Sequence, residues 1–265
     1  MILAATLSAC HSEPGTAPSP PVPSPPPVLL RDVVVSSLPA PYYHFEYDPA
    51  GRVQGASFAS GLRMYDVIYQ GGRISELRNN ALGNRDRLEY VYDNTGRVSA
   101  IRYVDSNELV YTTLFCSYDG PKLTGRERDR RVASGFIIEM TISLMYDPDG
   151  NLLEIIEHRP LIDGQQTETT TVDHFEQYDD RINIDGFGLI HTEFFDHLVL
   201  LPDVQLQKGN PARVTRTGNG LNFRVDYAYS YDDRDRPLDQ KRTLLLLNGP
   251  DAGRRFQTQS VFTYY

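Results

Sequence analysis

Two short acidic stretches of the chain carry side chains of the kind that bind calcium. They are Asp147-Pro148-Asp149-Gly150-Asn151 and Asp232-Asp233-Arg234-Asp235. Calcium takes six to eight oxygen ligands in proteins, and each stretch supplies about three. Glu154 lies near the first stretch, but no further carboxylate stands at a convincing spacing. Because aspartate is also a preferred turn residue, the sequence favours tight turns over calcium sites at both places.

A second candidate metal site consists of His191, Glu193 and His197. On a strand the three side chains would share one face, whereas on a helix only Glu193 and His197 are neighbours. The His-Glu-x-x-His signature of helical zinc sites does not occur in the sequence. We therefore assign no metal and no cofactor to the chain.

The sequence gives equally little support for nucleophilic catalysis. Cys116 lies in an apolar segment without an evident base, which is typical of a buried structural thiol. In an oxidising compartment a disulfide between Cys116 and Cys10 is the alternative. The sequence has no Gly-x-Ser-x-Gly elbow and no defined carboxylate pair in a cleft. We assign no catalytic residue and expect no enzyme activity.

The acidic stretches belong to a repeat of the form Tyr-Asp-x-x-Gly-Arg/Asn-Val/Leu. Its clear copies begin at Tyr47, Tyr69, Tyr92 and Tyr146, and its looser copies begin at Tyr118, Tyr178 and Tyr231. The aspartate suits the first position of a type I turn, and the glycine suits a position where φ is often positive. Each copy is therefore predicted to form the tip of a β-hairpin. The residues assigned to these turns are Asp48, Gly51, Gly72, Asp93, Gly96, Asp147 and Gly150.

Apolar residues after each turn recur at a spacing of three, as in the pair Val98 and Ile101. In a strictly alternating strand the members of such a pair would point to opposite faces. Either a bulge follows each turn, or the strands bury residues on both faces. The sequence alone leaves both alternatives open.

The repeat spacing predicts an all-β fold. Copies mostly stand roughly 20–30 residues apart, enough for two strands and two turns. The chain is thus predicted to form a long antiparallel up-and-down meander of about 14–16 strands, curled into a partial or closed barrel.

Two segments depart from this pattern. The helical spacing of apolar residues predicts one short helix near 193–201, and the charge of Arg126–Arg131 predicts an exposed loop or strand end.

The N-terminal residues have features of an exported, lipid-modified protein. The sequence Leu7-Ser8-Ala9-Cys10 resembles the bacterial lipobox, in which diacylglycerol is attached to the cysteine sulfur. Eight prolines follow between Pro14 and Pro27, a composition that favours an extended tether of roughly 60 Å over a disordered tail without lipid. The predicted organisation is a signal peptide over 1–10 with Cys10 as the lipid attachment residue, a tether over 11–29 and a single β-domain over 30–265.

The net charge of −9 and the pI near 5.1 argue against nucleic acid as a partner.

The copies of the repeat resemble the YD repeats of Rhs-type proteins. The order of lipobox, tether, hairpins and a late Gly209-Asn210-Pro211 turn resembles a bacterial lipoprotein family of unknown function with a porin-like fold. This resemblance implies a many-stranded sheet and no known activity. It also implies the outer membrane, because His11 replaces the aspartate that commonly retains lipoproteins at the inner membrane.

Three functions of different kinds follow. The first is a lipid-anchored module of the cell envelope, periplasmic or surface-exposed, that binds or scaffolds and takes a glycan or an apolar ligand. The second is an integral outer-membrane barrel, which would need alternating apolar residues on every strand. The third is an envelope hydrolase that acts on glycans. The polar strand segment 165–178 and the mean hydropathy of −0.41 favour the first over the second.

Overall fold

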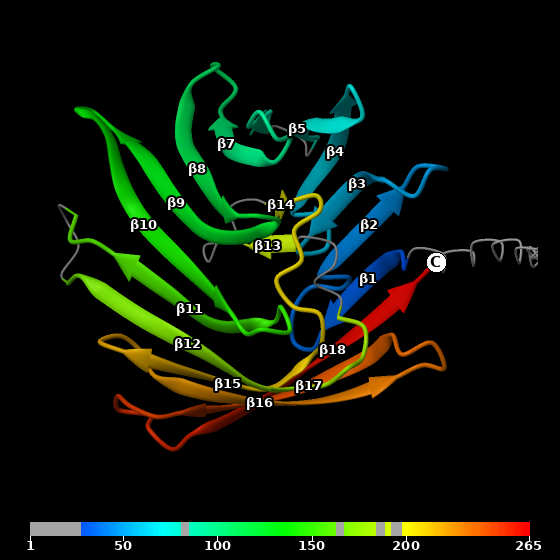
Figure 1. Cartoon of the computed structure of the whole chain (residues 1–265), viewed down its shortest axis with the longest axis vertical. Helices are drawn as coiled ribbons and strands as arrows, with labels where there is room; N and C mark the ends of the chain where they lie inside the picture. Colours follow the sequence, from blue (N-terminus) through cyan, green and yellow to red (C-terminus); the bar gives the residue numbers. More distant parts are fainter. Residues whose placement is uncertain (1–27, 81–84, 163–166, 184–188, 192–197) are drawn as a thin grey trace, which may run out of the picture.

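A computed structural model describes residues 28–80, 85–162, 167–183, 189–191 and 198–265 of the chain (Figure 1). These residues form 18 strands and no helix, so none of them belongs to a helix long and apolar enough to cross a membrane. The strands are β1 (Leu30–Val35), β2 (Tyr43–Tyr47), β3 (Val53–Phe58), β4 (Arg63–Gln70), β5 (Arg73–Asn79), β6 (Arg87–Tyr92), β7 (Val98–Val104), β8 (Val110–Asp119), β9 (Lys122–Val132), β10 (Gly135–Tyr146), β11 (Leu152–Arg159), β12 (Thr169–Tyr178), β13 (Leu189–His191), β14 (Leu198–Leu200), β15 (Pro211–Gly218), β16 (Phe223–Tyr231), β17 (Pro237–Leu246) and β18 (Arg255–Tyr264).

Sixteen of the strands form one closed antiparallel barrel. Neighbours in the barrel are neighbours in sequence, except that β12 pairs with β15 and β1 pairs with β18. The β1–β18 ladder joins Val33 to Phe262 and closes the sheet on itself. This architecture confirms the predicted all-β meander and, of the two predicted forms, selects the closed barrel.

A β-bulge follows six of the seven copies of the repeat, which resolves the alternative that the sequence leaves open. The exception is the copy at Tyr178, where β12 pairs with β15 without a register shift. Tyr92 pairs with Val98, but the preceding Val91 pairs with Ala100, so Ser99 is the extra residue. The same shift follows the turns after β2, β4, β8, β10 and β16. Because of the bulge, the side chains of Val98 and Ile101 both point to the buried face of the sheet, where they are 3% and 0% exposed.

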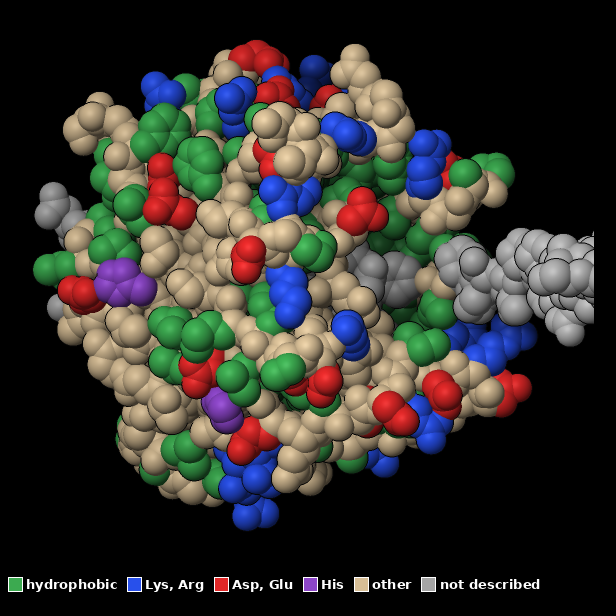
Figure 2. Space-filling view, in the orientation of Figure 1, with side chains coloured by type: hydrophobic (Ala, Val, Ile, Leu, Met, Phe, Trp, Pro, Cys, Tyr) green, Lys and Arg blue, Asp and Glu red, His purple; other side chains and the backbone are tan. Residues whose placement is uncertain are grey.

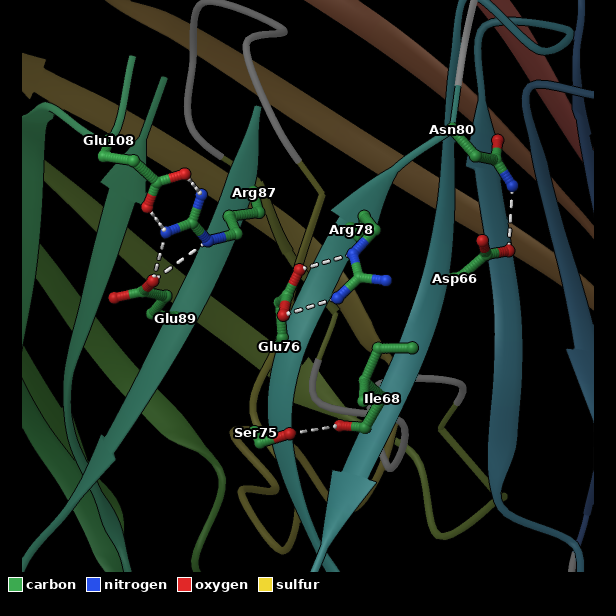
Figure 3. A network of polar contacts seen from close by, with 9 residues as sticks. All are labelled: Asp66, Ile68, Ser75, Glu76, Arg78, Asn80, Arg87, Glu89 and Glu108. Atoms are coloured by element: carbon green, nitrogen blue, oxygen red, sulfur yellow. Dashed lines mark hydrogen bonds and ion pairs between the residues drawn. The ribbon is translucent and has the colours of Figure 1, made fainter. Parts of the chain in front are cut away.

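The bulge residues also stabilise the ladder through their hydroxyl groups. Ser75 Oγ donates to the carbonyl of Ile68 at 3.1 Å, Ser99 Oγ to Val91 at 3.2 Å, and Thr124 Oγ1 to Ser117 at 3.3 Å. Figure 3 shows the first of these bonds between β4 and β5. A small hydroxyl residue at this position therefore has a local structural role.

The inner and outer faces of the barrel differ in chemistry. Leu77 and Leu88 on adjacent strands point inwards and are fully buried. Their neighbours point outwards and form ion pairs, with Arg78 Nε 2.8 Å from Glu76 and Arg87 bound to Glu89 (Figure 3). Figure 2 shows side chains of both charges scattered among hydrophobic ones over the visible face. The barrel therefore has a charged outer surface on these strands around an apolar interior.

The described part of the connection between β12 and β15 lies inside the barrel and contains the small sheet β13–β14 (Figure 1). Val199, Leu200 and Leu201 belong to the main hydrophobic core, and the amide of Leu200 donates to Tyr90 Oη at 3.2 Å. At the end of the connection, Asn151 Oδ1 accepts hydrogen bonds from the amides at positions 208 and 209, at 2.8 and 3.0 Å. The connection thus blocks part of the barrel lumen with apolar side chains.

The helix predicted near 193–201 is wrong where the structure describes this segment. Leu198–Leu200 form β14, and the remaining residues of the prediction before 198 lie outside the described residues. The physical reason is burial of consecutive residues. Val199, Leu200 and Leu201 are at most 3% exposed, and a short apolar run of this kind has no periodicity that separates a strand from a helix.

The prediction of an exposed loop or strand end over Arg126–Arg131 is also wrong. The segment lies within β9 and pairs with both β8 and β10. Arg128 is 8% exposed because its side chain lies on the inner face, where Nε is 3.0 Å from Glu139 Oε2. Ion pairing inside the barrel makes this charged strand compatible with burial.

Candidate functional site

The repeated turns all lie at one end of the barrel, which we call the turn rim. The meander places there every connection from β2, β4, β6, β8, β10, β12 and β16 to the next barrel strand, as well as the start of β1 and the end of β18. Residues Asp48, Gly51, Gly72, Asp93, Gly96, Asp147 and Gly150 lie in turns of this rim. The fold thus brings together side chains that are spread over most of the sequence.

In each complete turn, backbone amides of the same turn donate hydrogen bonds to the aspartate carboxylate. Asp93 Oδ1 accepts hydrogen bonds from the amides of Thr95 at 2.8 Å and Arg97 at 3.0 Å, and the Gly96 amide donates to the Asp93 carbonyl. The hydrogen bond from the Thr95 hydroxyl, followed by those from the two amides, lowers the pKa of Asp93 well below its ordinary value. Gly96 has a φ of 90°, in the left-handed region that favours glycine.

Most of the recurring tyrosines tie their strand to the start of the strand before it, whereas Tyr231 donates to Asp179 Oδ2 instead. Tyr92 Oη donates to the carbonyl of Ile74, the residue that follows the preceding turn, at 2.7 Å. Equivalent bonds join Tyr47 to Leu30, Tyr69 to Val53, Tyr146 to Leu123, Tyr178 to Leu152 and Tyr264 to Pro237, at 2.7 to 2.9 Å. The recurring tyrosine therefore provides a ring for the core and a donor for the rim.

In five of the turns the residue that precedes the next strand or opens it is basic and lies over the ring of the next tyrosine, whereas Asn151 takes this position after Tyr146. Arg52 lies 4.5 Å from the ring centroid of Tyr69, and Arg97 lies 4.9 Å from that of Tyr118. Cation–π pairs of the same kind join Arg73 to Tyr92, Lys122 to Tyr146 and Arg236 to Tyr264. This contact could be predicted from the sequence, because the basic residue of one copy and the tyrosine of the next copy recur at a similar spacing.

A cavity of about 740 Å³ opens at the turn rim between the hairpins and the inserted connection. The aromatic wall is formed by Tyr47, Tyr69, Tyr92, Tyr118 and Tyr264. Val53, Ile74, Val98, Leu200 and Val204 supply apolar surface, and Arg52, Arg73, Arg97 and Asp203 supply charge. Its volume is in the range of small-molecule sites, which are also mostly apolar with a few polar groups.

The phenol groups of this wall are poor acids. Burial raises the pKa of Tyr92 to about 12, although the charge of Arg73 opposes the shift. The pKa values of Tyr47, Tyr118 and Tyr264 are raised further, also mainly by burial. The tyrosines are therefore neutral at physiological pH, and those bonded to a carbonyl have already used their only proton.

The other residues singled out in the sequence do not come together as a site in the described part of the chain. The carboxylate of Asp232 binds two amides of its own turn and Arg236 Nε, at 2.6 to 2.9 Å, which leaves little capacity for calcium. His191 lies in β13, while Glu193, His197 and Cys10 are outside the described residues. Among the described residues, no three His, Cys, Asp or Glu side chains are grouped closely enough to hold a metal ion.

Cys116 lies in β8 as a half-buried thiol that packs against the core. Burial raises its pKa to about 11, despite the nearby positive charge of Arg126. Because the thiolate is the nucleophilic form, this environment does not activate the sulfur at neutral pH.

The sequence does not reveal a set of ion pairs on the inner face of the second half of the barrel. Arg216 donates to both carboxylate oxygens of Asp173 at 2.7 and 2.6 Å, and Arg159 Nε donates to Glu157 at 2.7 Å. These pairs lie on different strands at positions without a shared motif, so only the barrel register shows that they face inwards.

Comparison with known proteins identifies a similar fold but no family. No family model and no curated protein matches the chain. A solved porin-like protein from Bacteroides uniformis is similar, with a TM-score of 0.59 and 13% sequence identity, over 90% of this chain and 95% of that chain. The fold is porin-like. At this identity the similarity concerns the fold alone, and it confirms the many-stranded antiparallel barrel that the resemblance in sequence implies. It does not show that the chain belongs to the lipoprotein family or contains true YD repeats.

Proposed function

We propose that this porin-like barrel is a non-catalytic binding module of the cell envelope that takes a small, largely apolar ligand in the cavity at the turn rim. The observation that carries the proposal is the aromatic wall of that cavity. Five tyrosines from five different strands converge on it, and the inserted connection forms its other side. The described part of the connection packs into the core through Val199 and Leu201, so it holds Leu200 and Val204 in place as one side of the cavity.

The charged outer face supports a module outside the lipid phase over an integral outer-membrane barrel. The Arg78 side chain is 57% exposed, and Arg213, Asp226 and Arg224 form a partly exposed cluster on β15 and β16. An arginine on the lipid face of a barrel costs about 2–4 kcal/mol at the membrane midplane. Lipid attachment at Cys10 would hold such a module at the outer membrane, on the periplasmic or the outer surface. Val28 and Leu29, which follow the proline-rich segment, line the cavity itself.

Ligand binding can be tested with a neutral fluorescent probe such as 1-N-phenylnaphthylamine. We expect saturable binding to the intact protein and a loss of about tenfold in affinity in Val53→Phe, which adds volume inside the cavity. Val261→Phe is the matched control, because Val261 is 40% exposed on the outer face of β18. Equal binding by both variants would refute the placement of the ligand at the turn rim.

Lipid attachment is tested separately by metabolic labelling with a radioactive fatty acid. We expect label in the wild-type protein and none in Cys10→Ala, together with a move of the variant from the membrane to the soluble fraction. An unlabelled wild-type protein would refute the anchor and leave the barrel's ligand site untouched.

A further inference from the structure

The cavity at the turn rim contains one arginine that lacks a carboxylate partner. Arg52 Nε is held by Asp48 at 2.7 Å, and Arg97 is held by Asp93 at 3.3 Å. Both aspartates are the second residue of their repeat. The copy that carries Arg73 has Gln70 at this position instead. In the part of the chain that the structure describes, Arg73 makes no ion pair.

Arg73 is nevertheless held in place over the cavity. Its guanidinium carbon lies 5.4 Å from the ring centroid of Tyr92, and its Nη2 lies against the backbone of Gly96 in the next turn. A Cβ at position 96 would collide with Nη2, so the glycine provides the space that the guanidinium uses. A guanidinium has five N–H donors in a planar fork that fits a carboxylate.

The rest of the cavity determines which anion would fit. The phenols of Tyr69 and Tyr92 donate to backbone carbonyls, so they offer ring surface and no free proton to a ligand. A sugar with several hydroxyl groups would find few polar partners on such a wall. Asp203 is the one carboxylate among the described residues that line the cavity, and no ion pair joins it to Arg73. On a chain of net charge −9, this is a local site for a negative group beside an apolar surface.

We propose that Arg73 is an anion-binding residue that selects a small amphiphile with a single carboxylate head and an aliphatic body. The head pairs with the Arg73 guanidinium at the mouth, and the body lies against Ile74, Val98 and the tyrosine rings. This inference rests on the proposed binding function and names the ligand class for the same cavity.

The test compares decanoate with 1-decanol, which share an alkyl chain and differ in charge, by isothermal titration of the intact protein. The wild-type protein is expected to bind decanoate about tenfold more tightly than decanol, because the carboxylate accepts charge-assisted hydrogen bonds from Arg73, whose strength the exposure of the site reduces. Arg73→Gln should remove the preference by weakening decanoate alone. Added salt should reduce the preference in the wild type.

Two matched variants control for general effects of losing an arginine. Arg78→Gln removes an exposed arginine from the outer face and should leave both affinities unchanged. Arg52→Gln removes a guanidinium that Asp48 already holds, and it should reduce the preference less than Arg73→Gln does. Circular dichroism of each variant verifies that the barrel is folded.

The outcomes separate the two proposals. Equal binding of decanoate and decanol, or a preference that survives in Arg73→Gln, would overturn the role of Arg73 while leaving an apolar site at the rim. Absence of binding by both probes in the wild type would overturn the ligand site itself and this inference with it.

Discussion

Replacing Tyr92 by phenylalanine isolates the hydrogen bond that links successive hairpins. The change removes Oη, which donates to the Ile74 carbonyl at 2.7 Å, and keeps the ring that lies under Arg73. A net hydrogen bond contributes about 0.5–1.5 kcal/mol, and an unpaired buried carbonyl adds to the loss. We expect the free energy of unfolding to fall by about 1–2 kcal/mol, which lowers the melting temperature by about 2–4 °C in a chain of this size.

The repeat allows an additivity test of the same bond. Tyr47 and Tyr92 lie four strands apart, or about 19 Å at the usual strand spacing, and both donate to a carbonyl of the preceding hairpin. Since residues this far apart act independently, the double variant to phenylalanine should lose about 2–4 kcal/mol in total.

Urea unfolding followed by circular dichroism provides the measurement. Tyr227→Phe is the control, because the Tyr227 hydroxyl has no hydrogen bond to the residues that the structure describes while burial raises its pKa. That variant should keep the wild-type stability. A Tyr92→Phe variant as stable as the wild type, beside a strongly destabilised Tyr92→Ala, would show that only the ring matters and would refute the proposed role of the hydroxyl.

Three further changes test other parts of the fold. Gly96→Ala and Gly120→Ala should each cost about 1–2 kcal/mol in urea unfolding, because φ is positive at both positions; at position 96 the methyl group also displaces the flexible end of Arg73, and a much larger loss there would show that Arg73 cannot move. Glu139→Gln should cost about 1.5–3 kcal/mol in the same assay, since it removes the carboxylate charge that lies 3.0 Å from the buried Arg128; a variant as stable as the wild type would show that this ion pair does not stabilise the barrel. The turn carboxylates Asp48, Asp93 and Asp232 have lowered pKa values in the fold, so their stabilisation is complete above the ordinary pKa of 3.8 and is lost as pH falls further. Melting temperatures should therefore stay level from pH 7 to about pH 5 and fall below about pH 4, and Asp93→Asn should flatten the fall; a decline that begins near pH 6 would point to histidine instead.

The sequence predicts the barrel well because its signal is local and repeated. Each copy such as Tyr92–Val98 contains its own turn chemistry, and the spacing of copies sets the number of strands. The bulge is encoded too, since the spacing of Val98 and Ile101 is compatible with a common face only if one residue is skipped. The pattern does not predict whether the barrel closes, because closure depends on the β1–β18 ladder, whose strands are far apart in sequence.

The site is less predictable because its parts interact across strands. The Arg73–Tyr92 contact joins two copies of the repeat, and the carboxylates inside the barrel pair with arginines on neighbouring strands. A single strand such as β9 then has a composition typical of an exposed segment. The prediction for Val199–Leu201 is wrong for the opposite reason. The segment is apolar and buried on all sides, so it has no polar face from which a strand or helix period could be recognised.

The closing ladder has a consequence for the order of folding. β1 pairs with β2 through only two residue pairs, Asp32 with His44 and Val33 with Tyr43, whereas β18 supplies five partners along its length. The first strand therefore acquires most of its backbone hydrogen bonds from the last one. Contacts of such large sequence separation form slowly, and until they form the sheet keeps two unpaired edges that can join other chains. A protein of this design is expected to depend on chaperones until the β1–β18 ladder has formed, and to resist proteolysis afterwards.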